Sequence, residues 1–203
     1  MKKLQIIIIL LISVISANSQ DLIIYDSTYN VGIYKTFEEF RTNSPSIPFN
    51  YSIKTRSMGY GFMNMAGTVT FYSINLDRKE GKSIGSVFGF CDGNSIYINE
   101  GYPQLGPRAK FSKIEYLGKY SYFKDVKCNS NYNSMNNTFV TSCSLEEKVM
   151  DINDAGAVIR LTKKRLQNII ARDPEILKTF NQEKRKKKKL KEYLIKYLEK
   201  HPY

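Results

Sequence analysis

Few residues of this chain of 203 could carry out catalysis, and their types already exclude several mechanisms. The one histidine, His201, is expected on a frayed tail near the end of the sequence. Serine and cysteine hydrolases need a general base beside the nucleophile, and zinc sites use clusters of His and Cys. We therefore expect no catalytic triad, no metal site and no cofactor.

Three cysteines, Cys91, Cys128 and Cys143, are present. Cys128 and Cys143 flank a polar, Asn-rich segment, 129–138, that is expected to be a loop. A bridge between them would close a loop of about 15 residues and contribute about 3 kcal/mol in the chain-entropy model. Cys91 follows an apolar strand pattern and is interpreted as a small buried hydrophobic residue. The sequence thus predicts a Cys128–Cys143 disulfide with Cys91 unpaired.

Carboxylates offer the one alternative route to catalysis. Paired acids can hydrolyse a glycosidic bond, one as general acid and the other as base or nucleophile. Four acids fall in the strand-rich part of the chain: Asp92, Glu100, Glu115 and Asp125. Nothing in the sequence pairs them, and Asp92 is explained by its turn. A carboxylate-dependent hydrolase acting in a cleft is therefore the alternative function.

The strongest polar feature is a run of six cations: Lys184, Arg185, Lys186, Lys187, Lys188 and Lys189. Residues 21–159 hold 14 basic and 14 acidic side chains, whereas residues 160–203 hold 15 basic and 5 acidic ones. Basic helices bind anionic lipids, nucleic acid or acidic polymers. The competing interpretation is a solvated face whose lysine stems cover apolar surface. Nucleic acid is the weaker candidate partner, because an exported protein rarely meets it.

Export is predicted by the first nineteen residues. A short basic start precedes an apolar run from Leu4 to Ile15, and small residues, Ala17 and Ser19, stand where a signal peptidase cleaves. The run is shorter than the roughly 20 residues that cross a bilayer. We expect a signal peptide at 1–19, a mature chain that starts near Gln20 without a transmembrane segment, and a secreted or periplasmic location.

The elements that position these groups follow from hydrophobic periodicity. A short helix is predicted over Tyr34–Asn43, with Thr36 and Glu39 as a capping box. Alternating apolar and polar residues predict an antiparallel meander between Tyr51 and Leu161, closed as a small barrel or folded as a sandwich. Its strands are expected at 68–76, 84–91, 95–99, 111–117, 119–126, 147–152 and 157–161. The fold class is therefore α+β.

Two helices are predicted after residue 161. Thr162 caps the first, and Asp173-Pro174 begins the second, which is expected to run toward Lys200 and to carry the cations. The chain then divides into a signal peptide at 1–19, a β-rich body at 20–161 and a basic helical segment at 162–203. On this interpretation the last twenty residues serve partner binding and are dispensable for the fold.

Four segments together resemble a family of small exported proteins of unknown function from Bacteroidetes: Phe88–Asn99, Ile114–Phe123, Leu161–Lys164 and Asp173–Glu175. The resemblance extends over nearly all of the mature chain. It implies a bacterial secreted or envelope protein and supplies no activity and no catalytic residue. The sequence thus favours a non-enzymatic interaction module that contacts an anionic envelope surface or an acidic protein through its basic C-terminal helix.

Overall fold

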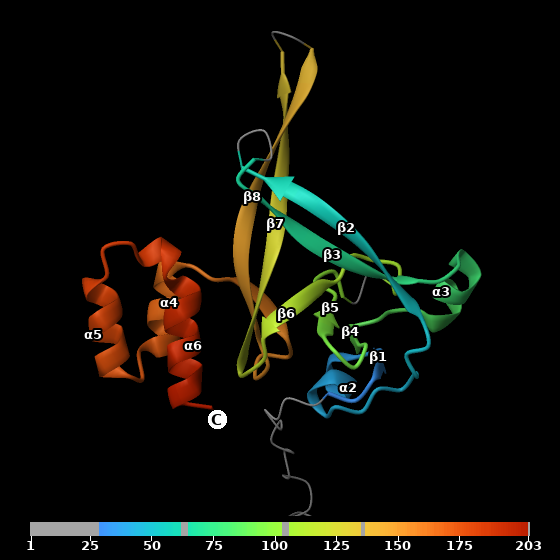
Figure 1. The fold of residues 1–203 in the computed structure, drawn as a ribbon, viewed down its shortest axis with the longest axis horizontal. Coiled ribbons are helices and arrows are strands. Elements are labelled where there is room, and N and C mark those ends of the chain that lie inside the picture. The colour runs from blue at the N-terminus through green and yellow to red at the C-terminus, as the bar shows by residue number, and fades with distance from the viewer. Residues whose placement is uncertain (1–28, 62–64, 103–105, 135–136, 203) are drawn as a thin grey trace, which may run out of the picture.

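The structure is a computed structural model that describes residues 29–61, 65–102, 106–134 and 137–202. Within them, seven antiparallel strands form one curled sheet, and two further strands form a hairpin beside it (Figure 1). Two short helices lie in the first half of the chain, and the remaining helices follow the last strand. The expected α+β fold with mainly antiparallel strands is confirmed. The expected signal peptide lies outside the described residues.

The seven-stranded sheet has the order β1-β4-β5-β6-β7-β8-β9, and β2 pairs with β3 in the separate hairpin. The sheet does not close, because β1 and β9 form its two edges. The strands are β1 (Gly32–Tyr34), β2 (Ser52–Tyr60), β3 (Gly67–Asn75), β4 (Gly89–Cys91), β5 (Ile96–Ile98), β6 (Ser112–Tyr116), β7 (Tyr120–Asn133), β8 (Thr138–Asp151) and β9 (Ala157–Arg160). The helices are α2 (Phe37–Arg41), α3 (Arg78–Ile84), α4 (Lys163–Ile170), α5 (Pro174–Gln182), the 3-10 turn η3 (Lys186–Lys188) and α6 (Leu190–Lys200).

The N-terminal helix forms as α2 but is shorter than predicted, because Tyr34 belongs to β1. The Thr36 hydroxyl accepts the Glu39 N–H at 3.1 Å, and the Glu39 carboxylate accepts the Lys35 N–H at 2.7 Å. The first bond satisfies a donor that a helix start leaves free, and the second ties the Glu39 side chain to the residue before the cap. Phe40 is fully buried and anchors the helix on the sheet.

The strand predicted over 84–91 is wrong in its first half, where helix α3 ends at Ile84 and β4 begins only at Gly89. Asp77 caps α3 by accepting the Glu80 N–H at 2.7 Å. Gly85 ends the helix with a φ of 78°, a conformation that costs glycine little.

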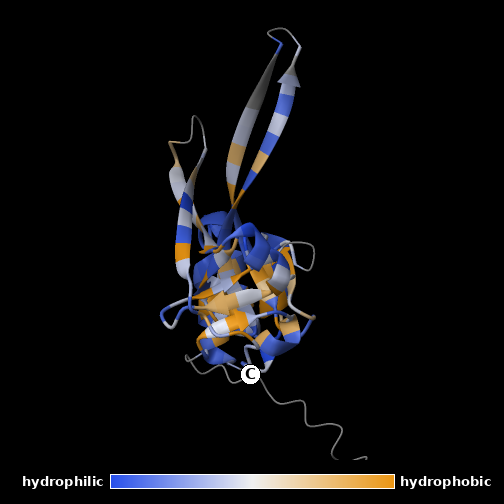
Figure 2. Cartoon of the chain, turned by 90° about the vertical axis from the view of Figure 1, so that its right-hand side faces the viewer, coloured by the Kyte–Doolittle hydropathy of each residue, from blue (hydrophilic) through white to orange (hydrophobic). Residues whose placement is uncertain are grey.

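Strands β7 and β8 form a long arm that projects from the body (Figure 1). The predicted disulfide is confirmed, since Cys128 and Cys143 face each other across the arm with an S–S distance of 2.03 Å. The loop expected at 129–138 is instead mostly strand. Residues 129–132 are exposed, and Figure 2 shows the described part of the outer arm as largely hydrophilic. Because both faces of the outer arm are exposed to water, its residues do not alternate between apolar and polar, and the sequence gives no strand signal there.

Removing the disulfide by a Cys128→Ser/Cys143→Ser change is expected to loosen the arm while the body stays folded. The lost cross-link is worth at most about 3 kcal/mol, given that it spans about 15 residues. Amide exchange should accelerate in residues 129–134 and 141–142, while Phe123 and Val149, both fully buried, stay protected. Exchange measured by NMR checks this. Equal acceleration in both regions would show that the bridge stabilises the whole domain.

The C-terminal helices pack beside β7, β8 and β9 and share one core with them (Figure 1). Its buried members are Tyr122, Val149, Leu161, Leu166, Ile170, Ile176, Phe180, Leu190, Leu194, Tyr197 and Leu198. The second predicted helix is broken into α5, η3 and α6, because Glu183 is extended and the chain reverses there. Among the described residues, no helix is both long and apolar enough to cross a membrane.

Candidate functional site

The six predicted cations lie on the connection between α5 and α6 rather than along one helix, and we call residues 184–189 the basic turn. Two of them stabilise the turn itself. The Lys186 ammonium donates to the carbonyls of Asn181 at 2.7 Å and Glu183 at 2.9 Å. These bonds give hydrogen-bond donors to carbonyl groups that the end of α5 leaves without a partner inside the helix. Lys189 pairs with Glu192 at 2.6 Å.

The other four cations point into solvent. Lys184, Arg185, Lys187 and Lys188 are exposed and form no ion pair with any residue that the structure describes. The turn that carries them is fixed on both sides, by Phe180 at the end of α5 and Leu190 at the start of α6, both buried. The reversal of the chain therefore gathers four unpaired positive charges at one end of the helical layer.

Of the four candidate carboxylates, two have local structural roles. Asp92 Oδ1 accepts the N–H groups of Asn94 at 2.8 Å and Ser95 at 2.7 Å, as a turn residue does. Glu115 pairs with Lys124 at 3.1 Å and with Lys191 of α6 at 2.7 Å. The contacts of both carboxylates are therefore those of a turn and of ion pairs between elements of the fold.

Glu100 and Asp125 do meet, but through a lysine that the sequence did not single out. The Lys148 ammonium binds a carboxylate oxygen of Glu100 and lies 2.6 Å from Asp125 Oδ2. Lys110 pairs with the other Asp125 oxygen at 2.6 Å, and the Ser112 hydroxyl donates to Glu100 at 3.0 Å. The Asp125 and Lys148 side chains are only 7% and 16% exposed. We call these residues the Lys148 network.

Burial and charge separate the acidities of the two carboxyls. Burial raises the pKa of Glu100 in spite of the neighbouring Lys148. At Asp125, burial is outweighed by hydrogen bonds from Lys110 and Lys148, which lower the pKa of that carboxyl. Opposed pKa shifts are what a general acid and a general base require.

The geometry nevertheless argues for a structural network. The Lys148 ammonium occupies the position between the two carboxylates where a substrate oxygen would have to sit. A hollow of about 370 Å³ beside Glu100 is lined by Asn99, Tyr102 and Gly156, among others, but not by Asp125. No specific observation therefore favours the hydrolase alternative.

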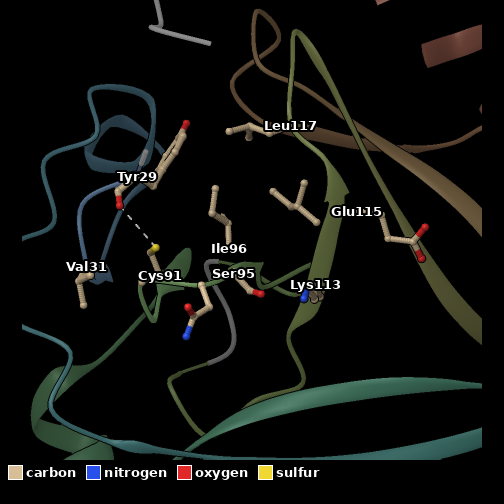
Figure 3. A pocket seen from close by; sticks show the side chains of 11 residues that line it. Tyr29, Val31, Cys91, Ser95, Ile96, Lys113, Glu115 and Leu117 are labelled. Atoms are coloured by element: carbon tan, nitrogen blue, oxygen red, sulfur yellow. Dashed lines mark hydrogen bonds between the residues drawn. The ribbon is translucent and has the colours of Figure 1, made fainter. Parts of the chain in front are cut away.

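Cys91, at the end of β4, lines a hollow of about 350 Å³ between the segment before β1, the β4–β5 turn and β6, shown in Figure 3. Its Sγ points to the Tyr29 carbonyl oxygen, 3.6 Å away (Figure 3). Burial raises the pKa of the thiol, whereas a nucleophilic cysteine needs a lowered one. The prediction that Cys91 is an unpaired, buried residue is confirmed.

His201 stabilises the end of the chain through contacts with Asp173 and Tyr197. Its Nε2 lies 2.8 Å from Asp173 Oδ2, and its ring packs at 4.8 Å from the ring of Tyr197. Asp173 also accepts the Ile176 N–H at 3.0 Å and pairs with Lys200 at 2.9 Å, and these contacts lower the pKa of its carboxyl. The tail that the sequence suggested to be frayed is thus held against the start of α5. No group of three or more His, Cys, Asp or Glu among the described residues is arranged to hold a metal ion.

Comparison with known proteins gives one match. A protein-family model described as "Family of unknown function (DUF6563)" matches residues 32–203. No curated protein and no solved structure matches the chain. The matched residues span every described helix and strand, from β1 to α6.

Proposed function

Because the chain belongs to DUF6563, a family of unknown function, no relative supplies an activity, and we propose from its geometry that it is a non-enzymatic interaction module. Its partner is an anionic envelope surface, or alternatively an acidic protein, bound through the basic turn. The observation that carries the proposal is the set of four exposed, unpaired cations on a turn held by a packed core.

Electrostatics supports binding without a deep pocket. A Lys or Arg near an anionic membrane surface contributes about 1 kcal/mol. Four cations on one turn are therefore enough for measurable attraction, and the fixed turn reduces the entropy lost on binding. The neighbouring acids, Glu183 and Glu192, leave these four cations unpaired.

The proposed location is outside the cytoplasm, either secreted or periplasmic. The Cys128–Cys143 bridge supports this, because disulfides persist mainly in oxidising compartments. The signal-peptide pattern at 1–19 supports it independently. Export and the bacterial source that the resemblance implied stay proposals.

Replacing Lys184, Arg185, Lys187 and Lys188 by glutamine is expected to abolish binding to vesicles that contain phosphatidylglycerol. At about 1 kcal/mol per cation, the affinity at low salt should fall by roughly 100-fold or more. Binding of the unaltered protein should itself weaken as salt is raised, because exposed charges are screened beyond about 8 Å at physiological ionic strength. Vesicle co-sedimentation at low and high salt measures both effects.

The matched control removes the same charge elsewhere. Lys113, Lys127, Arg172 and Lys178 are exposed cations outside the basic turn, and their replacement by glutamine should leave most of the binding intact. Equal losses in the two quadruple variants would show that net charge alone drives adsorption. If the unaltered protein ignores the vesicles at low salt, the basic turn is a solvated surface and the proposal fails.

A further inference from the structure

A second basic feature lies on the other side of the β7–β8 arm from the C-terminal helices, where the β2–β3 hairpin meets residues 108–110 (Figure 1). A cleft of about 380 Å³ opens there, and we call it the basic cleft. The residues of its lining that the argument uses are Lys54, Arg56, Met58, Phe71, Arg108 and Lys110. Its volume is in the range of small-molecule sites, about 300–1,000 Å³.

Strand pairing places cations on both sides of Phe71. Arg56 is the direct cross-strand partner of Phe71, and Lys54 lies two residues before it on the same face of β2. Along the other edge of β3, Tyr72 exchanges backbone hydrogen bonds with Phe111, at 3.0 and 2.8 Å. This pairing holds Lys110 beside β3, with its ammonium 4.2 Å from the centre of the Phe71 ring.

Arg108 is supported from a different element. Its stem packs on Gly81 of α3, where an added methyl would lie 3.2 Å from the Arg108 Cδ. A smaller hollow of about 260 Å³ continues from the cleft along this side and adds Arg78 and Lys82. The positive charge therefore extends beyond the cleft itself.

Most of this charge is unneutralised. Within the described part of the chain, Lys54, Arg56 and Arg108 form no ion pair, and only Lys110 is paired, with Asp125. None of the residues that line the cleft is acidic. A concave, partly apolar wall beneath unpaired cations concentrates positive potential inside the cleft.

We propose that the basic cleft binds a phosphomonoester, with the phosphate between Arg56 and Arg108 and the organic part against Met58 and Ala109. Two guanidinium groups suit a phosphate because each can donate two parallel hydrogen bonds. The doubly charged phosphate also matches the number of cations better than a single carboxylate does. This site is independent of the basic turn and does not rest on the function proposed above.

The test uses phenyl phosphate as the probe, with benzoate and inorganic phosphate for comparison, in calorimetric titrations of the full-length protein. Phenyl phosphate should bind most tightly, because benzoate lacks the second charge and inorganic phosphate lacks the apolar ring. Replacing Arg56 and Arg108 by glutamine should weaken its binding about tenfold or more, because the phosphate loses charge-assisted hydrogen bonds from both guanidinium groups. The control is a Lys113→Gln/Lys127→Gln variant, which has the same net charge as the Arg56/Arg108 variant. It should bind phenyl phosphate as tightly as the unaltered protein does.

NMR adds a readout that does not depend on affinity. Phenyl phosphate should shift amide signals of β2, β3 and residues 106–111 and leave those of residues 184–189 unmoved. A phosphomonoester can be free or can be a lipid headgroup, so short-chain phosphatidic acid forms the second arm. Tighter binding of the lipid than of phenyl phosphate at the same residues would identify a headgroup site. Equal binding of benzoate, unchanged binding by the Arg56/Arg108 variant, or signal shifts elsewhere would overturn the proposal.

Discussion

Replacing Leu194 by alanine is expected to lower the free energy of unfolding by about 2–5 kcal/mol, the range for large-to-small changes in a packed core. Leu194 lies on α6 with none of its surface exposed, in the cluster that contains Leu166 of α4 and Tyr122 of β7. The truncation leaves a cavity at the junction of helices and sheet. Urea unfolding followed by circular dichroism measures the loss.

The control stays on the same helix. Lys196 and Glu199 are exposed on α6, and alanine at either position should change stability by no more than about 0.5 kcal/mol. Removal of residues 190–203 should go further and prevent stable folding, because four buried side chains would leave the core together: Leu190, Leu194, Tyr197 and Leu198. A deletion that melts like the full chain would show that α6 is an accessory element.

This prediction reverses the expectation drawn from the sequence, which treated the last twenty residues as separable. The apolar residues at 190, 194, 197 and 198 are evident in the sequence, but the run of six cations immediately before them favoured a role in partner binding over a role in the core. The chain reverses direction at Glu183, and this reversal packs α6 against α4 instead of leaving it in solvent. A chain reversal without glycine or proline leaves no strong mark in a sequence.

Other elements could be predicted where one face is buried and the other is exposed to solvent, because apolar and polar residues then alternate along the strand. The strand β3 shows this, since Val69 and Phe71, two residues apart on one face, are buried, whereas Thr68 between Gly67 and Val69 is exposed. The outer arm was missed because it has no buried face. Helix α3 was missed although Asp77 and Glu80 form a capping signal, because the apolar residues that follow were interpreted as one strand.

The site residues divide in the same way. The disulfide could be predicted from the sequence, because the two cysteines lie close together in the chain. The Lys148 network could not, because it depends on the register that pairs β7 with β8 and on a contact between Lys148 and Glu100, which lie 48 positions apart in the chain. The basic cleft likewise joins residues some fifty positions apart. Charges that are balanced over a sequence can still be segregated in space.

Replacing Asp125 by asparagine is expected to destabilise the fold by about 3–5 kcal/mol at neutral pH, as the breaking of a buried ion pair does. Lys148 and Lys110 would keep their charges and lose the carboxylate that both of them bind. Glu100→Gln should cost less, because burial raises the pKa of Glu100 and already disfavours its ionised form. Comparing these two isosteric changes separates the loss of a favourable charge from the loss of shape.

The effect of the Asp125 change should also depend on pH in a defined direction. The pKa of Asp125 in the folded protein is lowered, so its ionised form stabilises the fold above the unfolded pKa of about 3.9. That contribution is lost as the pH falls through the folded pKa. The stability difference between the unaltered protein and the Asp125→Asn variant should therefore shrink when urea unfolding is repeated in strongly acidic buffer. A difference that stays constant from neutral to acidic pH would mean that the asparagine disturbs packing rather than charge.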